Sequence, residues 1–306
     1  MSGDMRESLG EDLQLLEQGP HGNGRVSLWW ASVPTMTNEK VGVIGGFSAD
    51  SVAAAQALLT AAERELRSRG CTIAVGPMNG STWKPYRFVT EAGTEPAFFL
   101  EPTHPPQWPE WWRAAGYEVL ANYYSTATTD LRHRDERLDR VAARMTSAGV
   151  SIRSLDAACF ESELGRIYDV SAIAFQSNYL YTPQPKEAFV AQYAGFRERL
   201  CTDLVLLAEQ QGRTIGYVFS LPDYAQAQRG DKMTTFIVKT LAVLPGREFA
   251  GLGALLLAEG HDAARRLGFT RGIHALMHET NQSRNLSAHY AHTIRRYALF
   301  SKRLSA

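Results

Sequence analysis

The chain lacks features that mark several large classes of protein. Its 32 basic residues are balanced by 32 acidic ones, so its formal net charge at pH 7 is zero. Proteins that bind duplex DNA usually carry a concentrated basic excess, so the total charge gives no reason to expect a nucleic-acid partner. Hydrophobic residues make up 44% and charged residues 21% of the 306 residues. That balance is typical of a globular chain and argues against disorder.

Cysteine is scarce, and long apolar runs are missing. Cys71, Cys159 and Cys201 lie far apart, and none belongs to a C-x-x-C pair. Histidines show no metal-ligand spacing, so we expect no metal site, and we expect the cysteines to be small buried hydrophobes in a reducing compartment. Residues 1–18 are acidic without a long apolar stretch, and no run reaches the roughly 18 apolar residues of a membrane span. We therefore expect neither a signal peptide nor a membrane partner, and a cytoplasmic protein.

The order of the predicted elements indicates an α+β fold, with helices flanking a mostly antiparallel mixed sheet. Residues 1–24 are polar and end in a glycine-rich run, which predicts a flexible lead-in. Strands are expected at 25–33, 40–47, 71–76, 117–131, 150–155, 204–209, 214–221, 234–244, 271–277 and 295–302, and helices at 51–69, 108–116, 160–175, 187–200, 250–267 and 281–289.

A charge-dense segment divides the chain into two predicted domains. Residues 132–147 place Leu138, Val141 and Met145 at helical spacing among many charges. This pattern predicts a connector helix. We therefore expect one domain at residues 1–131 and a second at residues 148–306.

One segment of the second half carries a chemical signal. The strand at 234–244 runs into the turn 245–253 (PGREFAGLG), and this turn opens the helix at 250–267. Gly251 and Gly253 have no Cβ, so a ligand could approach the backbone closely there. The first N–H groups of a helix have no partner within the helix and attract an anion such as phosphate. The alternative is a helix that simply begins at a tight turn, because the spacing fits neither Walker A nor G-x-G-x-x-G.

With its neighbouring elements, this segment resembles the GCN5-related N-acetyltransferase (GNAT) superfamily. Val243-x-Pro245 and the run Glu248 to Gly253 occupy the family's R/Q-x-x-G-x-G/A motif, and the resemblance covers about residues 148–306. It implies acetyl-CoA as acyl donor, with the pyrophosphate on backbone N–H groups of the turn and the pantetheine arm along the preceding strand. The implied cofactor-binding residues are Leu241, Ala242, Val243, Arg247, Phe249, Ala250, Gly251, Leu252, Gly253 and Ala254.

One position departs from the family pattern. Glu248 stands where the family has Arg or Gln, and a carboxylate facing a pyrophosphate would repel it. We expect Glu248 to point away from the ligand while Arg247 supplies positive charge. The alternative is weak binding of CoA.

The segment from His278 to Tyr290 resembles the family's second CoA-binding region. By this resemblance Asn281 contacts the pantetheine arm, Ser283 is a further donor beside the thiol, and Tyr290 protonates the departing thiolate. The alternatives are a helix cap for Ser283 and an aromatic packed between helix and sheet for Tyr290. His278 and Glu279, at the end of a predicted strand, are the candidates for the base that accepts the proton of the amine.

An aromatic stretch links the first two helices of the second half. In the family this connection lines the acceptor pocket, which makes Phe175, Asn178, Tyr179 and Tyr181 the candidate substrate-binding residues. The alternative is hydrophobic cover over the sheet.

The first half also resembles a GNAT domain, in degenerate form. The turn before its helix has no glycine and places Asp50 where a phosphate would sit, so we expect no CoA there. Trp83 follows a tight turn and either reaches the acceptor site of the other domain or serves in packing.

The resemblance leads to one function and one rival. The chain is expected to be an acyl-CoA-dependent N-acyltransferase that moves an acetyl group to the amine of a small molecule by direct attack. No serine or cysteine has a recognisable nucleophile setting. The rival is a non-catalytic CoA-binding or scaffold module of the same fold, which Glu248 and the degenerate first half favour. Homodimerisation through the tryptophan-rich first half is a further alternative.

Overall fold

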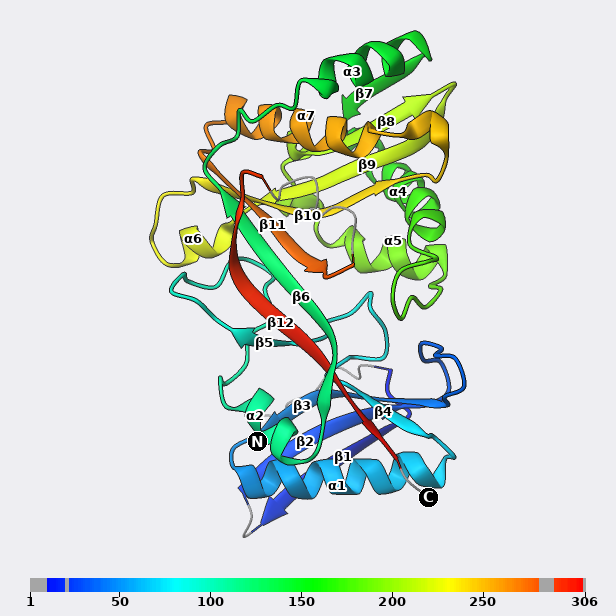
Figure 1. The fold of residues 1–306 in the computed structure, drawn as a ribbon, viewed down its shortest axis with the longest axis vertical. Helices are drawn as coiled ribbons and strands as arrows, with labels where there is room; N and C mark the ends of the chain where they lie inside the picture. The colour runs from blue at the N-terminus through cyan, green and yellow to red at the C-terminus, as the bar shows by residue number, and fades with distance from the viewer. Residues whose placement is uncertain (1–9, 20–21, 281–288, 305–306) are drawn as a thin grey trace.

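A single long sheet runs through the molecule, with helices packed on its faces (Figure 1). The structure is a computed structural model that describes residues 10–19, 22–280 and 289–304. The sheet has 12 strands, most of them antiparallel to their neighbours. α1 covers one end of the sheet, and α7, α4 and α5 cover the other (Figure 1). The predicted fold class is confirmed.

The first half builds one end of the sheet and its covering helices. Its elements are β1 (Leu13–Gly19), β2 (Gly22–Trp29), β3 (Val41–Ala49), α1 (Val52–Ser68), β4 (Ile73–Gly76), β5 (Phe88–Glu91), α2 (Trp108–Ala114) and β6 (Glu118–Thr128). α1 begins at Val52 because the Ser51 side chain caps it, and it buries one apolar face against β2 and β3.

Part of the expected flexible lead-in is an ordered strand, so that prediction was wrong for residues 13–19. β1 pairs antiparallel with β2 along its whole length. Leu13 and Leu15 pack against the core of the first half, while Gln14 between them is exposed. This short alternation of apolar and polar residues supplies enough buried surface to hold an edge strand.

The second half follows a connector helix. α3 (Arg137–Ser147) matches the predicted helix at 132–147. The later elements are β7 (Val150–Ser154), α4 (Phe160–Ala174), α5 (Lys186–Ala194), β8 (Val205–Gln210), β9 (Arg213–Pro222), α6 (Tyr224–Gln228), β10 (Thr235–Val243), α7 (Leu252–Arg266), β11 (Arg271–His278) and β12 (His292–Arg303).

The two halves exchange strands at the centre of the molecule. The order along the sheet is β1-β2-β3-β4-β12-β6-β11-β10-β9-β8-β7. β12, the last strand of the chain, therefore lies between β4 and β6 of the first half, and β6 lies between β12 and β11 of the second. Figure 1 shows β6 and β12 crossing together from one end of the molecule to the other. Residues 132–147 separate the two halves along the sequence, whereas the sheet continues through both halves.

Two tryptophans of the first half, Trp108 and Trp112, pack in its core. Trp112 is fully buried, and its ring meets Phe47 and Phe88 edge to face, with centroids 5.5 and 5.4 Å apart. Trp108 contacts the same two rings. Such pairs add about 0.5–1.5 kcal/mol each beyond the burial of apolar area. These side chains therefore stabilise the first half.

Cysteine burial differs from the expectation at one position. Cys71 is buried, Cys201 is partly buried, and Cys159 is exposed at the end of a short turn before α4. Within residues 10–19, 22–280 and 289–304, no helix is long and apolar enough to cross a membrane.

Candidate active site at the split of the sheet

The sheet splits between β10 and β11. The two strands pair in parallel only from Thr235 to Val238 on β10, opposite Arg271 to His274 on β11, and they diverge beyond this point. Each strand is irregular where the split opens. β10 has a register shift against β9 at Lys239, and β11 has one against β6 near Leu276. The diverging edge of β10 leaves backbone groups that an extended ligand can pair with.

The turn after β10 ends at an uncapped helix. Gly251 is the N-cap of α7, with a φ of +84°, and among the described residues no side chain caps the first N–H groups of this helix. A Cβ on Gly251 would come within 2.8 Å of Val141 on α3, so the packing itself requires this glycine. A Cβ on Gly253 would meet nothing closer than 3.8 Å. Packing therefore does not require Gly253, where an added Cβ would only touch Val243 and Leu241 at ordinary van der Waals distance, beside N–H groups that an anion site needs.

Charged side chains surround the turn in an arrangement that the sequence did not fully predict. The carboxylate of Glu248 folds back to within 2.7 Å of the position that a Cβ on Gly246 would occupy. Arg144 of α3 donates hydrogen bonds to the backbone oxygens of Glu248, at 3.3 Å, and Ala250. Arg247 is exposed. Because Arg144 lies on the connector helix, about a hundred residues earlier in the chain, no local pattern linked it to the turn.

The equivalent turn of the first half is filled by the protein's own side chains. Ser51 Oγ accepts a hydrogen bond from the N–H of Ala54 at 3.0 Å. The Asp50 carboxylate accepts from the backbone N–H and the side-chain amide of Asn23, at 2.8 and 3.0 Å. A phosphate would have to displace Ser51 and would meet the charge of Asp50. The helix N-terminus of the second half has neither obstacle.

His278 lies at the end of β11 among aromatic rings. Its ring centroid is 4.9 Å from that of Tyr123 on β6 and 5.4 Å from that of Tyr179 on the α4–α5 connection. Its Nδ1 accepts the N–H of Thr280 at 3.2 Å and lies 2.8 Å from Thr280 Oγ1, whereas its buried Nε2 has no hydrogen-bond partner among the described residues. Burial lowers the pKa of His278, so the imidazole is neutral at pH 7 and able to accept a proton.

Glu279, the other candidate base, is already engaged. Its carboxylate accepts hydrogen bonds from the backbone N–H and the side-chain amide of Asn122 on β6, at 3.3 and 3.2 Å. Its own N–H donates to the Asn122 carbonyl. Glu279 therefore clamps β11 to β6, and His278 is the freer of the two.

Tyr290 lies on the other face of the sheet. His274 pairs with Thr126 and His278 with Tyr123, three residues apart on β6, so the irregularity between them puts the two histidines on opposite faces. The Tyr290 ring lies 6.2 Å from that of His274, and it stacks on His133. Burial raises the pKa of Tyr290 to about 12.

Two further predicted residues fall outside the described part of the chain. Asn281 and Ser283 belong to residues 281–288, so their expected contacts with the cofactor stay predictions.

Trp83 of the first half reaches the α4–α5 connection of the second. Its indole N–H donates to the Thr182 carbonyl at 2.7 Å. Its ring packs against Phe175, Tyr181 and Phe189, with centroids 6.3, 5.9 and 5.8 Å away. Phe175 and Tyr181 thus form a shared wall with the other half, whereas Tyr179 turns toward His278.

Asn178 stands apart from this wall. It is exposed, and its backbone N–H donates to the Phe175 carbonyl at 2.9 Å to form a tight turn.

Comparison with known proteins identifies the fold. A GCN5-related N-acetyltransferase from Sphaerobacter thermophilus superimposes with a TM-score of 0.52 and 13% identity, over 92% of this chain and 77% of that one. A tandem GNAT protein from the clavulanic acid biosynthesis pathway gives 0.51 and 12%, over 97% and 85%. The chain has the tandem GNAT fold. This result confirms the resemblance found in the sequence.

Similarity at the level of sequence is weaker. No family model matches the chain. A curated protein, the "Bacterial ceramide synthase" of Caulobacter vibrioides (strain NA1000 / CB15N), is 29% identical over 183 residues. The match covers 58% of this chain and 46% of the relative, so the chain spans about half of that protein's length.

Two cations at the split of the GNAT sheet were not predicted. Arg87 precedes β5 in the first half, is only 6% exposed, and donates from Nη1 to the Leu276 carbonyl at 3.0 Å. Lys239 sits at the register shift of β10, and its Nζ lies 3.4 Å from the Leu100 carbonyl. Nothing in the sequence signals either one, because both reach this place through strand exchange and an irregular strand.

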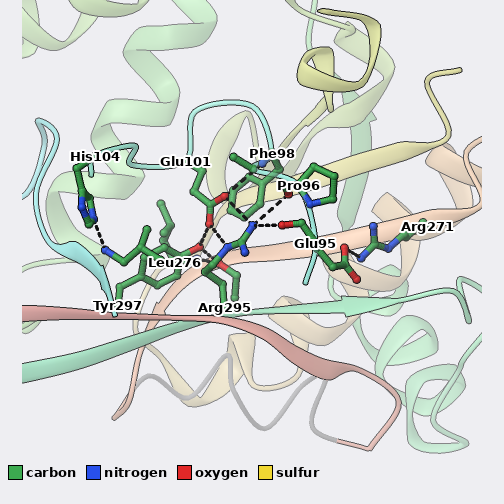
Figure 2. A network of polar contacts seen from close by, with 12 residues as sticks. Glu95, Pro96, Phe98, Glu101, His104, Arg271, Leu276, Arg295 and Tyr297 are labelled. Atoms are coloured by element: carbon green, nitrogen blue, oxygen red, sulfur yellow. Dashed lines mark hydrogen bonds and ion pairs between the residues drawn. The ribbon is translucent and has the colours of Figure 1, made fainter. Parts of the chain in front are cut away.

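A buried polar network supports the irregularity of β11. Figure 2 shows Glu101 between Arg295 and Tyr297, with Leu276 close by. The Glu101 carboxylate accepts from Arg295 Nε at 2.7 Å and from Tyr297 OH at 2.5 Å. Tyr297 OH lies 3.0 Å from Ser125 Oγ, which accepts the N–H of Leu276 at 3.0 Å. The network therefore extends from β12 through β6 to the strand that carries His278.

Proposed function

We propose that this chain is an acyl-CoA-dependent N-acyltransferase that moves an acetyl group from acetyl-CoA to the amine of a small molecule. The observation that carries the proposal is the split between β10 and β11, which leads to the uncapped N-terminus of α7 at Gly251 and Gly253. Solved acetyltransferases share the fold at a TM-score of 0.52. That likeness supports acyl transfer as the class of reaction.

The residues at the split suit the two ends of a CoA thioester. The N–H groups at positions 251–254 would hold the pyrophosphate through the helix N-terminus, with Arg144 and Arg247 adding positive charge nearby. Leu241, Ala242 and Val243 would present the free edge of β10 to the pantetheine arm. A chain of zero net charge can hold a polyanion in this way because backbone dipoles do most of the binding.

His278 is the base that we favour. In the proposed step the neutral imidazole accepts a proton from the amine, and the nitrogen lone pair forms the amide bond to the acyl carbon as the C–S bond breaks. Donors along the diverging edge of β10 would stabilise the oxyanion. Glu279 would act by keeping β11 against β6. Tyr290 lies on the α7 face, away from His278, so we give it no part in this step, and the departing thiolate takes its proton from solvent.

The curated relative agrees with amide formation. A ceramide is an amide of a long-chain acid, so a protein named as a ceramide synthase makes the same kind of bond. Long acyl chains therefore belong among the donors to be tried beside acetyl-CoA. We place the reaction in the cytoplasm, as the composition suggests.

The test compares two glycine-to-alanine variants of the same helix. Acetyl-CoA is titrated calorimetrically into the wild type, Gly253→Ala and Gly260→Ala. We expect Gly253→Ala to weaken binding about tenfold, or ~1.4 kcal/mol, because the new Cβ enters the space beside the N–H groups. Gly260 lies inside α7 with its nearest non-helical neighbour 3.5 Å from an added Cβ, so that variant should bind as the wild type does.

Measuring the release of free CoA in the presence of a panel of amines distinguishes the transferase from the non-catalytic module. Binding followed by thiol release supports the transferase, whereas binding without release across the panel favours the non-catalytic module. No binding of acetyl-CoA to the wild type would overturn both readings. Sedimentation of the same samples tests the alternative of a homodimer.

A further inference from the structure

Arg87 is a buried cation for which the described part of the chain supplies no anionic partner. Its guanidinium lies over the rings of Tyr86 and Tyr123, 3.6 and 3.9 Å from their centroids. Nη1 donates to a backbone carbonyl, and the buried Nε has no partner among the described residues. Arg295 is equally buried, but Glu101 neutralises it through two hydrogen bonds. Because burying a charge is costly unless it is paired, the site of Arg87 is incomplete.

Lys239 adds a second positive charge to the same place. Among the described residues its Nζ donates to a backbone carbonyl alone, that of Leu100. Burial and the nearby charge of Arg87 lower the pKa of Lys239 to about 8, although Glu101 opposes the shift. The Glu101 carboxylate is already shared by Arg295 and Tyr297. The charged side chains at the split therefore leave a surplus of positive charge, which would favour the binding of an anion there.

The cationic pair adjoins the candidate base. Tyr123 contacts Arg87 through its face and His278 through an edge-to-face ring pair. Leu276, whose carbonyl Arg87 holds, lies two residues before His278 on β11. A ligand of small size that reaches His278 is thus within reach of Arg87. The aromatic rings around both groups would exclude water from such a ligand.

We infer that the acceptor is an amine that also bears an anionic group, a carboxylate or a phosphate monoester, and that Arg87 binds this group with help from Lys239. The class of acceptor rests on the proposed function, whereas the anion site stands on the geometry alone. A planar guanidinium can donate two parallel hydrogen bonds to either group. The aromatic stacking fixes its plane before the ligand arrives.

The experiment measures binding of matched probes without acetyl-CoA. O-phosphoethanolamine is compared with ethanolamine, and β-alanine with propylamine, by calorimetry on the full chain. We expect at least one acidic amine to bind tenfold or more tightly than its neutral-tailed partner, and Arg87→Gln to remove this preference. Arg69→Gln is the matched control, because Arg69 also stacks on a ring, that of Trp30 at 4.6 Å, yet its side chain is 50% exposed.

Each outcome has a defined meaning. Equal binding within both pairs, or no binding of either acidic amine at millimolar concentration, overturns the anion site even where acetyl-CoA turns over. Preference for an acidic amine with no turnover keeps the site and overturns the proposed function. The two pairs distinguish phosphate from carboxylate. Should Arg87→Gln fail to fold, Lys239→Gln gives the same comparison, with a several-fold smaller preference expected.

Discussion

Ser125 offers the sharpest test of how the site is held together. Its side chain is fully buried on β6, and its Oγ accepts the N–H of Leu276 at 3.0 Å. Leu276 has a φ of +62°, in the left-handed region that non-glycine residues rarely adopt. It also falls in the register shift of β11 against β6, where the ladder of backbone hydrogen bonds is interrupted. Ser125 thus supplies the hydrogen bond that the irregular strand lost.

Ser125→Ala should therefore destabilise the chain by about 1–3 kcal/mol, because it leaves a buried N–H without a partner. Tyr297 keeps its bond to Glu101, so its contribution to the loss is small. Ser220→Ala is the matched control. Ser220 is also fully buried, but its Oγ has no hydrogen-bond partner among the described residues. Its replacement should change the free energy of unfolding by no more than about 0.5 kcal/mol, or stabilise the chain.

Urea unfolding followed by tryptophan fluorescence measures the free energy of unfolding of both variants. The two can be compared when this free energy falls with urea concentration at the same slope. We also expect Ser125→Ala to lower kcat for amine-dependent release of CoA while the Kd for acetyl-CoA stays near that of the wild type. The reason is that Leu276 lies two residues before His278, at the acceptor side of the split. If the two alanine variants unfold at the same urea concentration, the network does not hold β11, and the reasoning is refuted.

Three further predictions test the surroundings of the site. Glu101→Gln leaves Arg295 buried and unpaired and should cost about 3–5 kcal/mol, most of which a second change, Arg295→Met, should recover in urea unfolding. Burial lowers the pKa of His261 to about 4 and of His274 to about 3. As the pH falls, these histidines therefore gain a proton first in the unfolded chain, where their pKa is about 6.5. The free energy of unfolding should be at its full value above that pH and fall by up to ~2 kcal/mol per histidine at pH 5. An unchanged free energy of unfolding between pH 7.5 and 5 would contradict this. Tyr290→Phe should leave kcat within about twofold, since the hydroxyl lies on the α7 face, whereas a tenfold loss would make Tyr290 the acid.

Local patterns in the sequence predicted most elements and the turn before α7. Gly251 and Gly253 follow a strand and precede a helix, and each of these features depends on neighbouring residues only. β1 was missed because its apolar alternation is short and only pairing with β2 makes it stable. Elements of this kind are decided by tertiary contacts rather than by propensity.

The acceptor side could not be predicted for a different reason. Periodicity marks β6 and β12 as strands, but it does not say which strands they pair with, and their exchange brings Tyr123 beside His278. The face on which His278 lies, opposite to that of His274, depends on the irregularity of β11 at Leu276, whose φ is positive. No composition rule marks a leucine for that conformation.

Strand exchange also gives the degenerate first half a role. Its own helix N-terminus is closed by Ser51, yet it contributes β6, the Arg87 guanidinium and the Trp83 ring to the site of the second half. If the first half were removed, β11 would lose β6 along one edge, and the irregular strand that carries His278 would lose the hydrogen bond that Leu276 donates to Ser125. The first half can therefore lack an anion-binding turn and still keep the rest of its structure. The second half depends on the first for the acceptor side of the site and not for binding of the phosphate.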